Sequence, residues 1–258
     1  MSAPRVDNFD ILSSRLRLRG ELVTQTALHI GAGGASDMEV TDLPVLKTAQ
    51  GYPFIPGSSL KGIVRSTVEG LVRAAKNDRL RACDPLSFET SCGGNGSRSG
   101  PLKEHCAVCR LFGSHLVASH VRFSDARMLE EIDPPPIERR DGVSIDRDLR
   151  VAAGKRKYDL EVVSPGIAFV LELFVVNPEP WLMGLLVTGL DQLREGFTAI
   201  GGFSSRGLGR VSIAWTSLER VTAERLLLQG AKDPETLDIE AEFDGWRAAL
   251  AHMAEGGQ

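Results

Sequence analysis

The sequence predicts an α+β fold, and three kinds of pattern along the chain support this class. Residues 14–26 alternate leucines with charged side chains, which is typical of a half-buried strand. Residues 60–75 repeat apolar side chains at helical spacing, whereas 167–176 is a short apolar run that predicts a buried strand before a leucine-rich helix at 181–197. With 258 residues, 42% of them hydrophobic, the chain can bury a large core as one elaborated domain or two small ones.

After the first strand, a glycine-rich loop precedes a candidate acidic residue. A predicted strand at 28–30 breaks at the glycine-rich run 31–34, whose backbone can adopt geometry closed to other residues and approach a ligand closely. The loop returns at Asp42, just before a Pro-containing edge strand at 43–46. A lone aspartate before an apolar pair is most often a turn or capping residue. Asp37 could serve as well as Asp42, and spacing alone does not choose between them.

The next stretch, residues 52–75, ends one strand, turns and opens a helix whose first turn is basic. A Pro-Gly pair stops the strand, and Ser58 or Ser59 can supply an N-cap oxygen. Lys61 and Arg65 lie four residues apart and share a face near the helix N-terminus, where unpaired N–H groups and the helix dipole favour a phosphate. The pair is therefore a candidate anion site, although the solvated face of an ordinary amphipathic helix has the same pattern.

All four cysteines of the chain fall in one polar, glycine-rich region. Cys106 and Cys109 have the Cys-x-x-Cys spacing of a zinc knuckle, and Cys83 and Cys92 can complete a tetrahedral set. His105 adjoins Cys106 and could replace one of the cysteines. Structural Zn²⁺ at this site would order an insertion that has too few apolar residues to order itself. Four unrelated buried thiols are the alternative, which the absence of cysteine elsewhere disfavours.

A basic β-hairpin is predicted in the middle of the chain. Residues 143–163 alternate apolar and polar side chains in places, and two polar segments flank the small residues at 152–154. Such a hairpin has little core of its own. We therefore expect it to protrude and to become ordered on a partner or on RNA.

A second glycine-rich loop follows in residues 199–213. Glycines and serines surround Arg206 and lead into a strand, so bare amides and one guanidinium can face a phosphate. The loop lacks the glycine and lysine spacing of a P-loop and no helix follows it, which argues against a nucleotide triphosphatase. Helices at 219–229 and 243–253 are predicted to close the chain.

The formal net charge of −4 does not exclude a nucleic-acid partner, because the charge is unevenly distributed. Residues 232–258 hold seven acids and two bases, so the rest of the chain carries a net charge of +1. Residues 138–157 hold seven bases against four acids, a patch that can follow a phosphate backbone but is also common in solvated loops. No hydrophobic run resembles a signal peptide or a membrane span, so we expect a cytoplasmic protein.

Six motifs in a fixed order carry a resemblance to a known family. They are LHIGAG, TDLPVLK, IPGSSLKGIVRS, CAVCRLFGS, DGVSIDR and GGFSSRGLGRV, and they extend from Leu28 to Val211. Together they resemble the RAMP superfamily of CRISPR proteins, specifically the Csm3/Cas7-like backbone subunits of type III effector complexes. The resemblance implies one modified ferredoxin-like (RRM-type) domain over residues 1–258, with a zinc-binding insertion at 78–112 and a protruding hairpin, the thumb, at 134–165. It also implies that copies stack along a guide RNA with other Cas subunits, the thumb pressing between bases and distorting the target RNA.

The resemblance further implies roles for individual residues. The family positions that hold the guide backbone are matched by His29, Ser58, Ser59, Lys61 and Arg65, and the matching glycine-rich loop contains Arg206. Asp42, and not Asp37, matches the aspartate that the family requires for target cleavage. There a ribose 2′-OH attacks the adjacent phosphate in a reaction that needs a divalent cation, Mg²⁺ or Mn²⁺. Asp42 would hold the ion or take the proton.

Two other functions are compatible with the sequence. The same filament could bind RNA without cutting it, with the nuclease in another subunit. A stand-alone guide-processing ribonuclease of the same superfamily usually needs a general-base histidine, for which His29, His115 and His120 are available. The backbone-type motifs favour target cleavage, and no base-specific pocket is expected because guide–target pairing reads the sequence.

Overall fold

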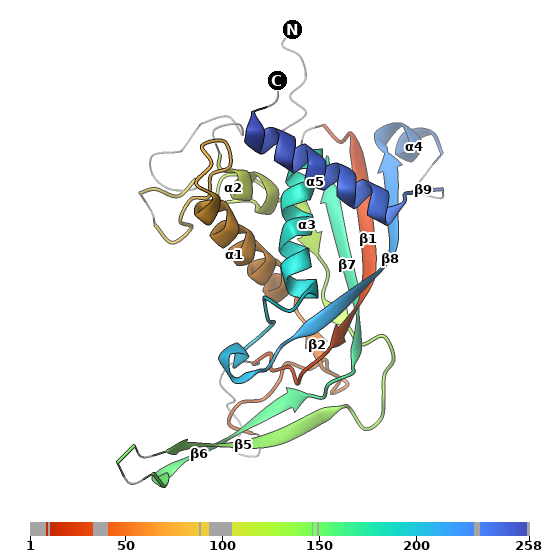
Figure 1. The fold of residues 1–258 in the computed structure, drawn as a ribbon. Coiled ribbons are helices and arrows are strands. Elements are labelled where there is room, and N and C mark those ends of the chain that lie inside the picture. The colour runs from red at the N-terminus through yellow and green to blue at the C-terminus, as the bar shows by residue number, and fades with distance from the viewer. Residues whose placement is uncertain are drawn as a thin grey trace.

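The structure is a computed structural model that describes residues 9, 11–32, 41–87, 89–92, 105–145, 147–148, 150–229 and 233–256. Its centre is an antiparallel sheet of five strands in the order β3-β7-β1-β8-β9, and three helices pack against one face (Figure 1). The strands are β1 (Ser14–Thr24), β3 (Val121–Phe123), β7 (Ala168–Val176), β8 (Val211–Thr222) and β9 (Glu235–Thr236), and the helices are α1 (Gly57–Ala75), α3 (Pro180–Arg194) and α5 (Ile239–Glu255). The predicted α+β class is confirmed.

The alternation within β1 decides which face of the sheet the helices cover. Leu16 and Leu22 are buried in the main core, whereas Arg17 points to the opposite face, because successive side chains of a strand alternate. The helices approach one another closely on the covered face. A Cβ atom on Gly189 of α3 would lie 2.7 Å from the side chain of Val68 on α1, so only glycine fits this crossing.

The start of α1 is capped differently from the sequence-based prediction. The N-cap residue is Pro56, and neither Ser58 nor Ser59 makes the side-chain capping bond. The Gly57 N–H instead donates to Asp125 Oδ1 at 2.8 Å, from the segment between β3 and the short strand β4 (Ala126–Arg127). β4 pairs with β2 (Phe54–Ile55), which brings Asp125 to the helix end. The cap was not predicted because it comes from a residue 68 positions away.

The predicted hairpin is present, with its turn in a different place. It consists of β5 (Ile137–Ile145) paired antiparallel with β6 (Ala152–Val163), and it projects away from the sheet and helices (Figure 1). Residues 152–154, which the sequence pattern placed between two polar segments, belong to β6. The ladder continues to the pair Ile145 and Ala152, so the chain reverses in the residues between them.

Three other segments differ from the sequence-based expectations. Residues 28–30 and 43–46 form isolated bridges instead of regular strands, for example between Leu43 and Leu160. The helix expected at 219–229 is only α4 (Ala223–Leu228), because β8 stays paired with β1 as far as Thr222. α5 is longer than expected and begins after the N-cap Asp238. None of the described helices is both long and apolar enough to cross a membrane.

Candidate metal centre and nucleic-acid interface

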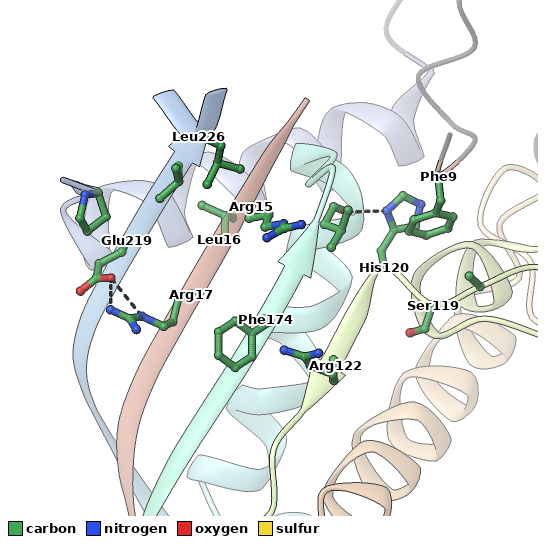
Figure 2. Close-up of a pocket in the computed structure, with 14 residues that line it drawn as sticks. Phe9, Arg15, Leu16, Arg17, Ser119, His120, Arg122, Phe174, Glu219 and Leu226 are labelled. Atoms are coloured by element: carbon green, nitrogen blue, oxygen red, sulfur yellow. Dashed lines mark hydrogen bonds and ion pairs between the residues drawn. The ribbon is translucent and has the colours of Figure 1, made fainter. Parts of the chain in front are cut away.

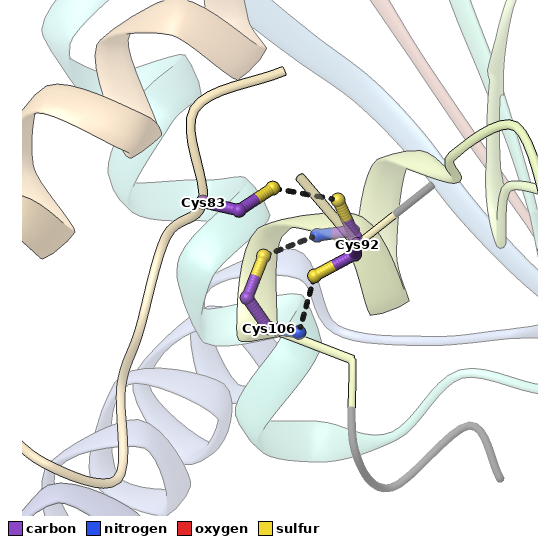
Figure 3. Close-up of side chains that lie close together, drawn as sticks. Cys83, Cys92 and Cys106 are labelled. Atoms are coloured by element: carbon purple, nitrogen blue, oxygen red, sulfur yellow. Dashed lines mark hydrogen bonds between the residues drawn. The ribbon is translucent and has the colours of Figure 1, made fainter. Parts of the chain in front are cut away.

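The four cysteines converge into one cluster, as their spacing predicted. Their Sγ atoms all lie within 4.8 Å of one another, and Figure 3 shows the sulfurs pointing toward a common centre. Cys106 is the N-cap of the short helix α2 (Ala107–Phe112), and Cys109 lies in its first turn, 3.5 Å from Cys83 between sulfurs. In a tetrahedral zinc site with Zn–S bonds of about 2.3 Å, the sulfurs lie ~3.8 Å apart. The donor set therefore fits structural Zn²⁺.

Backbone N–H groups and burial act in opposite directions on the thiols of the cluster. The backbone N–H groups of Cys109 and Cys106 donate to sulfurs of Cys106 and Cys92 at 3.4 and 3.2 Å. A hydrogen bond from the Cys109 thiol lowers the pKa of Cys106 to about 4, whereas burial raises the pKa of Cys92 to about 11. His105 is buried beside the cluster. Within the described part of the chain, however, it is not one of the mutually close metal donors, and its ring nitrogens have no hydrogen-bond partner.

Arg65 faces this cluster. Its guanidinium lies 3.6 Å from Cys109 Sγ and also donates to the Gly113 carbonyl at 3.1 Å and to Glu69 at 2.8 Å. Four thiolates around Zn²⁺ carry a net charge of −2, so a nearby guanidinium is a favourable counter-charge. The arginine predicted to hold RNA therefore has three protein partners already.

Lys61 lies one turn before Arg65 and lines two adjoining cavities. One, of about 310 Å³, also contains Gly57, Ser58 and Arg122, and the other, of about 380 Å³, extends to the cysteine cluster. Burial and the charge of Arg65 lower the pKa of Lys61. Ser58 is exposed at the same helix end and Ser59 is half-buried. We call the surface formed by Ser58, Lys61 and Arg122 the helix-start pocket.

His29 and Arg206 both contact Phe203 near the base of the hairpin. The Phe203 ring lies 5.3 Å from the His29 ring, between centroids, and the Arg206 guanidinium sits 5.1 Å above Phe203. Arg206 also donates to the Tyr158 hydroxyl of β6 at 2.8 Å. A Cβ on Gly201, which has a φ of +81°, would lie 2.1 Å from the His29 carbonyl oxygen, so only glycine permits this close approach.

Asp42 is exposed beside the same strand β6. Its carboxylate Oδ2 accepts the Asp159 N–H at 3.1 Å, and its own N–H donates to Asp159 Oδ1 at 2.8 Å. Within the described residues no group bonds to Asp42 Oδ1, and the residue is exposed, so this oxygen can hold a cation or take a proton. We call His29, Tyr158, Phe203 and Arg206 the hairpin-base site. Asp42 lies beside the next residue of β6, Asp159, whose side chain points to the opposite face of the strand from Tyr158. Asp37 lies outside the described residues.

The residues predicted to contact RNA thus do not lie on one continuous surface but fall into separate groups. His29 and Arg206 share the hairpin-base site, and Asp42 is bonded to Asp159 of β6. Ser58 and Lys61 belong to the helix-start pocket, and Arg65 faces the cysteine cluster. Sequence reasoning did not identify Tyr158, Phe203 and Asp159. The only available signal for Asp159 was its place between polar and buried residues in a strand.

The largest of the described cavities lies elsewhere, on the face of the sheet opposite the helices. It measures about 620 Å³, and Arg15, Arg122, Phe174 and His120 are among its lining residues (Figure 2). None of the residues that the sequence assigned to RNA or metal lines this cavity. His120, one of the histidines available as a general base, does line it. His120 Nδ1 bonds to the Val176 carbonyl at 2.7 Å, so this histidine is part of the sheet edge.

Comparison with known proteins agrees with the motif order. The RAMP superfamily model matches residues 21–212. Three curated relatives carry the name "CRISPR system Cms endoribonuclease Csm3". The protein from Enterococcus italicus is 26% identical over 220 residues, which cover 82% of this chain and 95% of the relative. The protein from Methanocaldococcus jannaschii is 24% identical over 78% of this chain and 79% of the relative. The protein from Mycobacterium tuberculosis is 27% identical over 78% of this chain and 87% of the relative.

Proposed function

Because the chain belongs to the RAMP superfamily, we propose that it is a guide-RNA-bound backbone subunit of a type III CRISPR effector complex that cuts complementary target RNA. One observation carries the nuclease part of this proposal. Asp42 is exposed beside a projecting hairpin and keeps one carboxylate oxygen free of the described residues.

The sheet topology supports a modified ferredoxin-like core. Its strands β3-β7-β1-β8 are antiparallel neighbours, with α1 in the connection from β1 to β3 and α3 in the connection from β7 to β8. This order supports the double split β-α-β arrangement of ferredoxin-like proteins. We assign residues 1–258 to one domain, with the zinc-binding insertion at 78–112 and the thumb at 134–165.

The hairpin has the surface expected of a thumb. Its end exposes the apolar side chains of Val143, Ile145 and Val151, with Ile145 65% exposed. Apolar side chains that project from a narrow hairpin can wedge between stacked bases, because contact with the base faces removes their apolar surface from water. The basic residues along both strands would hold the flanking phosphates.

Two surfaces are proposed to hold the guide backbone. His29 and Arg206 lie at the hairpin-base site, and Ser58, Ser59 and Lys61 lie at the start of α1, where the helix dipole and the Lys61 charge favour an anion. We assign Arg65 chiefly to the metal centre. Further copies of this chain and other Cas subunits would extend the RNA path in the cytoplasm.

The chemistry at Asp42 follows from its free oxygen. A bound Mg²⁺ or Mn²⁺ would neutralise the developing charge on the scissile phosphate. Asp42 would orient that ion or accept the proton of the attacking ribose 2′-OH. The 2′ oxygen then bonds to phosphorus as the P–O5′ bond breaks, leaving a 2′,3′-cyclic phosphate and a 5′ oxygen that takes a proton from water. Among the described residues, the neighbouring Asp159 and Glu161 carboxylates already bind protein donors, so we expect RNA oxygens or another subunit to complete the site.

A non-cleaving RNA scaffold is the second candidate, since a single free carboxylate is a small active site. Assembling the chain with its guide RNA and partner subunits tests the choice. We expect metal-dependent cuts at regular intervals in a complementary RNA, no cuts in an unrelated RNA, and none after chelation. Binding of the complementary RNA without cuts would support the scaffold, and specific cutting of precursor guide RNA by the isolated chain would support a processing enzyme.

Lys61 provides a test of the helix-start pocket. Lys61→Gln is expected to weaken guide-RNA binding and to reduce the salt dependence of log Kd by roughly 0.7, the value for one phosphate contact on a single strand. Binding measured over a range of salt concentrations checks this. Lys76→Gln serves as the matched control, because it removes one positive charge at the other end of the same helix. Equal salt slopes for the Lys61 variant and the wild type would contradict a phosphate contact.

A further inference from the structure

The bond pattern around Asp42 is reciprocal and spans two distant parts of the chain. The Asp42 N–H donates to the Asp159 carboxylate at 2.8 Å, and the Asp42 carboxylate accepts the Asp159 N–H at 3.1 Å. Two bonds that run in opposite directions fix both the position and the orientation of Asp42. The partner belongs to β6, one strand of the projecting hairpin.

The residues after Asp42 continue this attachment. The Leu43 N–H donates to the Asp159 carbonyl at 3.2 Å, and the Glu161 N–H donates to the Leu43 carbonyl at 3.0 Å. The Glu161 carboxylate accepts the Val45 N–H at 3.0 Å and pairs with Lys47. The segment that carries Asp42 is therefore bonded along the base of the hairpin.

Asp159 is itself held in place. It is buried, and its second carboxylate oxygen pairs with Arg139 on the adjacent strand β5. Both oxygens of Asp159 are thus occupied by groups of this chain, which leaves it no free oxygen for RNA or a cation. The contrast with Asp42, which keeps a free oxygen, separates a residue that supports the site from one that reacts.

We propose that Asp159 is a positioning residue that holds Asp42 in register with the hairpin, so that displacement of target bases and placement of the cutting carboxylate occur together. This inference rests on the proposed function and deepens it. A hairpin that wedges between bases at a fixed distance from Asp42 determines which phosphate the carboxylate meets. Misplacing a reactive group by about 1 Å can cost a hundredfold in rate.

The test compares three hairpin variants in the assembled complex, by single-turnover cutting of bound target and by target affinity. Asp159→Ala removes the acceptor for the Asp42 N–H and should slow cutting about ten- to a hundredfold with little change in Kd. Asp159→Asn keeps an oxygen acceptor and should stay within about threefold of wild type. Asp141→Ala is the matched control, because Asp141 faces Asp159 across the hairpin ladder but pairs only with the exposed Lys157 among the described residues.

Three results would overturn the proposal. These are wild-type cutting by Asp159→Ala, an equal loss in the alanine and asparagine variants, or a loss of target binding that matches the loss of cutting. Asp42→Ala is measured in the same experiment. If Asp42→Ala cuts normally the proposed function fails, and if only Asp159→Ala cuts normally the positioning role fails while the proposed function stands.

Hydrogen exchange in the full-length chain tests the attachment independently of cutting. In Asp159→Ala the Asp42 amide loses its acceptor, so this amide, followed in a peptide that begins several residues before it, should exchange on the order of fivefold faster. Asp159→Asn should exchange as the wild type does. Unchanged exchange in the alanine variant would remove the attachment on which the positioning role depends.

Discussion

Replacing Asp42 with alanine is expected to abolish the regularly spaced cuts in a bound target RNA while leaving the affinity for that RNA unchanged. A residue that orients a cation or accepts the attacking proton contributes roughly 10²–10⁴-fold to the rate, and among the described residues the neighbouring carboxylates are already bonded. Binding should persist because the exposed Asp42 carries negative charge and adds no attraction for phosphates. Single-turnover cutting and equilibrium binding, measured on the same complex, check both parts.

Asp42→Asn is the sharper companion variant. The amide oxygen can still accept the Asp159 N–H, so the local geometry is retained while the negative charge is lost. We expect this variant to cut as poorly as Asp42→Ala. Near-normal cutting by the asparagine variant would show that the residue is structural, and unchanged cutting by both variants would assign the nuclease to another subunit.

Breaking the metal centre should have the second large effect. Cys106→Ser is the most informative change, because serine is also a good N-cap residue and should preserve the start of α2. We expect the purified wild type to carry about one zinc per chain and the variant to lose it. Loss of a structural zinc should lower the free energy of unfolding by roughly 3 kcal/mol or more, or Tm by ~6–12 °C in a chain of this size. Metal analysis and thermal unfolding measure these two quantities.

His105→Ala serves as the control for the ligand set. The four sulfurs are mutually close without the histidine, so this variant should keep its zinc. Zinc loss in His105→Ala together with retention in a single cysteine variant would reassign the ligands. A wild-type protein that carries no zinc, with all four thiols freely titratable, would end the zinc assignment.

The cysteine cluster also adjoins the helix-start pocket, which we propose as an RNA surface. Arg65 bonds to Cys109 and to the Gly113 carbonyl, and Lys61 lies one turn earlier on the same helix face. A chain without zinc should therefore lose order in the wall of the helix-start pocket as well. Two basic residues at helical spacing therefore have different neighbours, the cysteine cluster for Arg65 and the helix-start pocket for Lys61.

Patterns of local origin were predictable from the sequence. The leucine alternation located β1, helical spacing located α1 and α3, and the Cys-x-x-Cys spacing indicated the metal cluster. These predictions succeed because a strand or helix repeats its geometry every 2.0 or 3.6 residues, and a short metal motif brings its ligands together over a few residues. The turn of the hairpin was misplaced because polar alternation continues through both strands and does not identify the reversal.

The sequence by itself thus determined the α+β class, the main elements, the cysteine set and, through six ordered motifs, the family. Only the tertiary structure decided which predicted residues share a site. In the folded chain Arg65 contacts Cys109, Asp125 caps α1, and Asp42 bonds to Asp159, 117 positions away. The physical reason is that spacing along the chain determines which side chains share a face of one element, whereas packing between elements determines what each face meets.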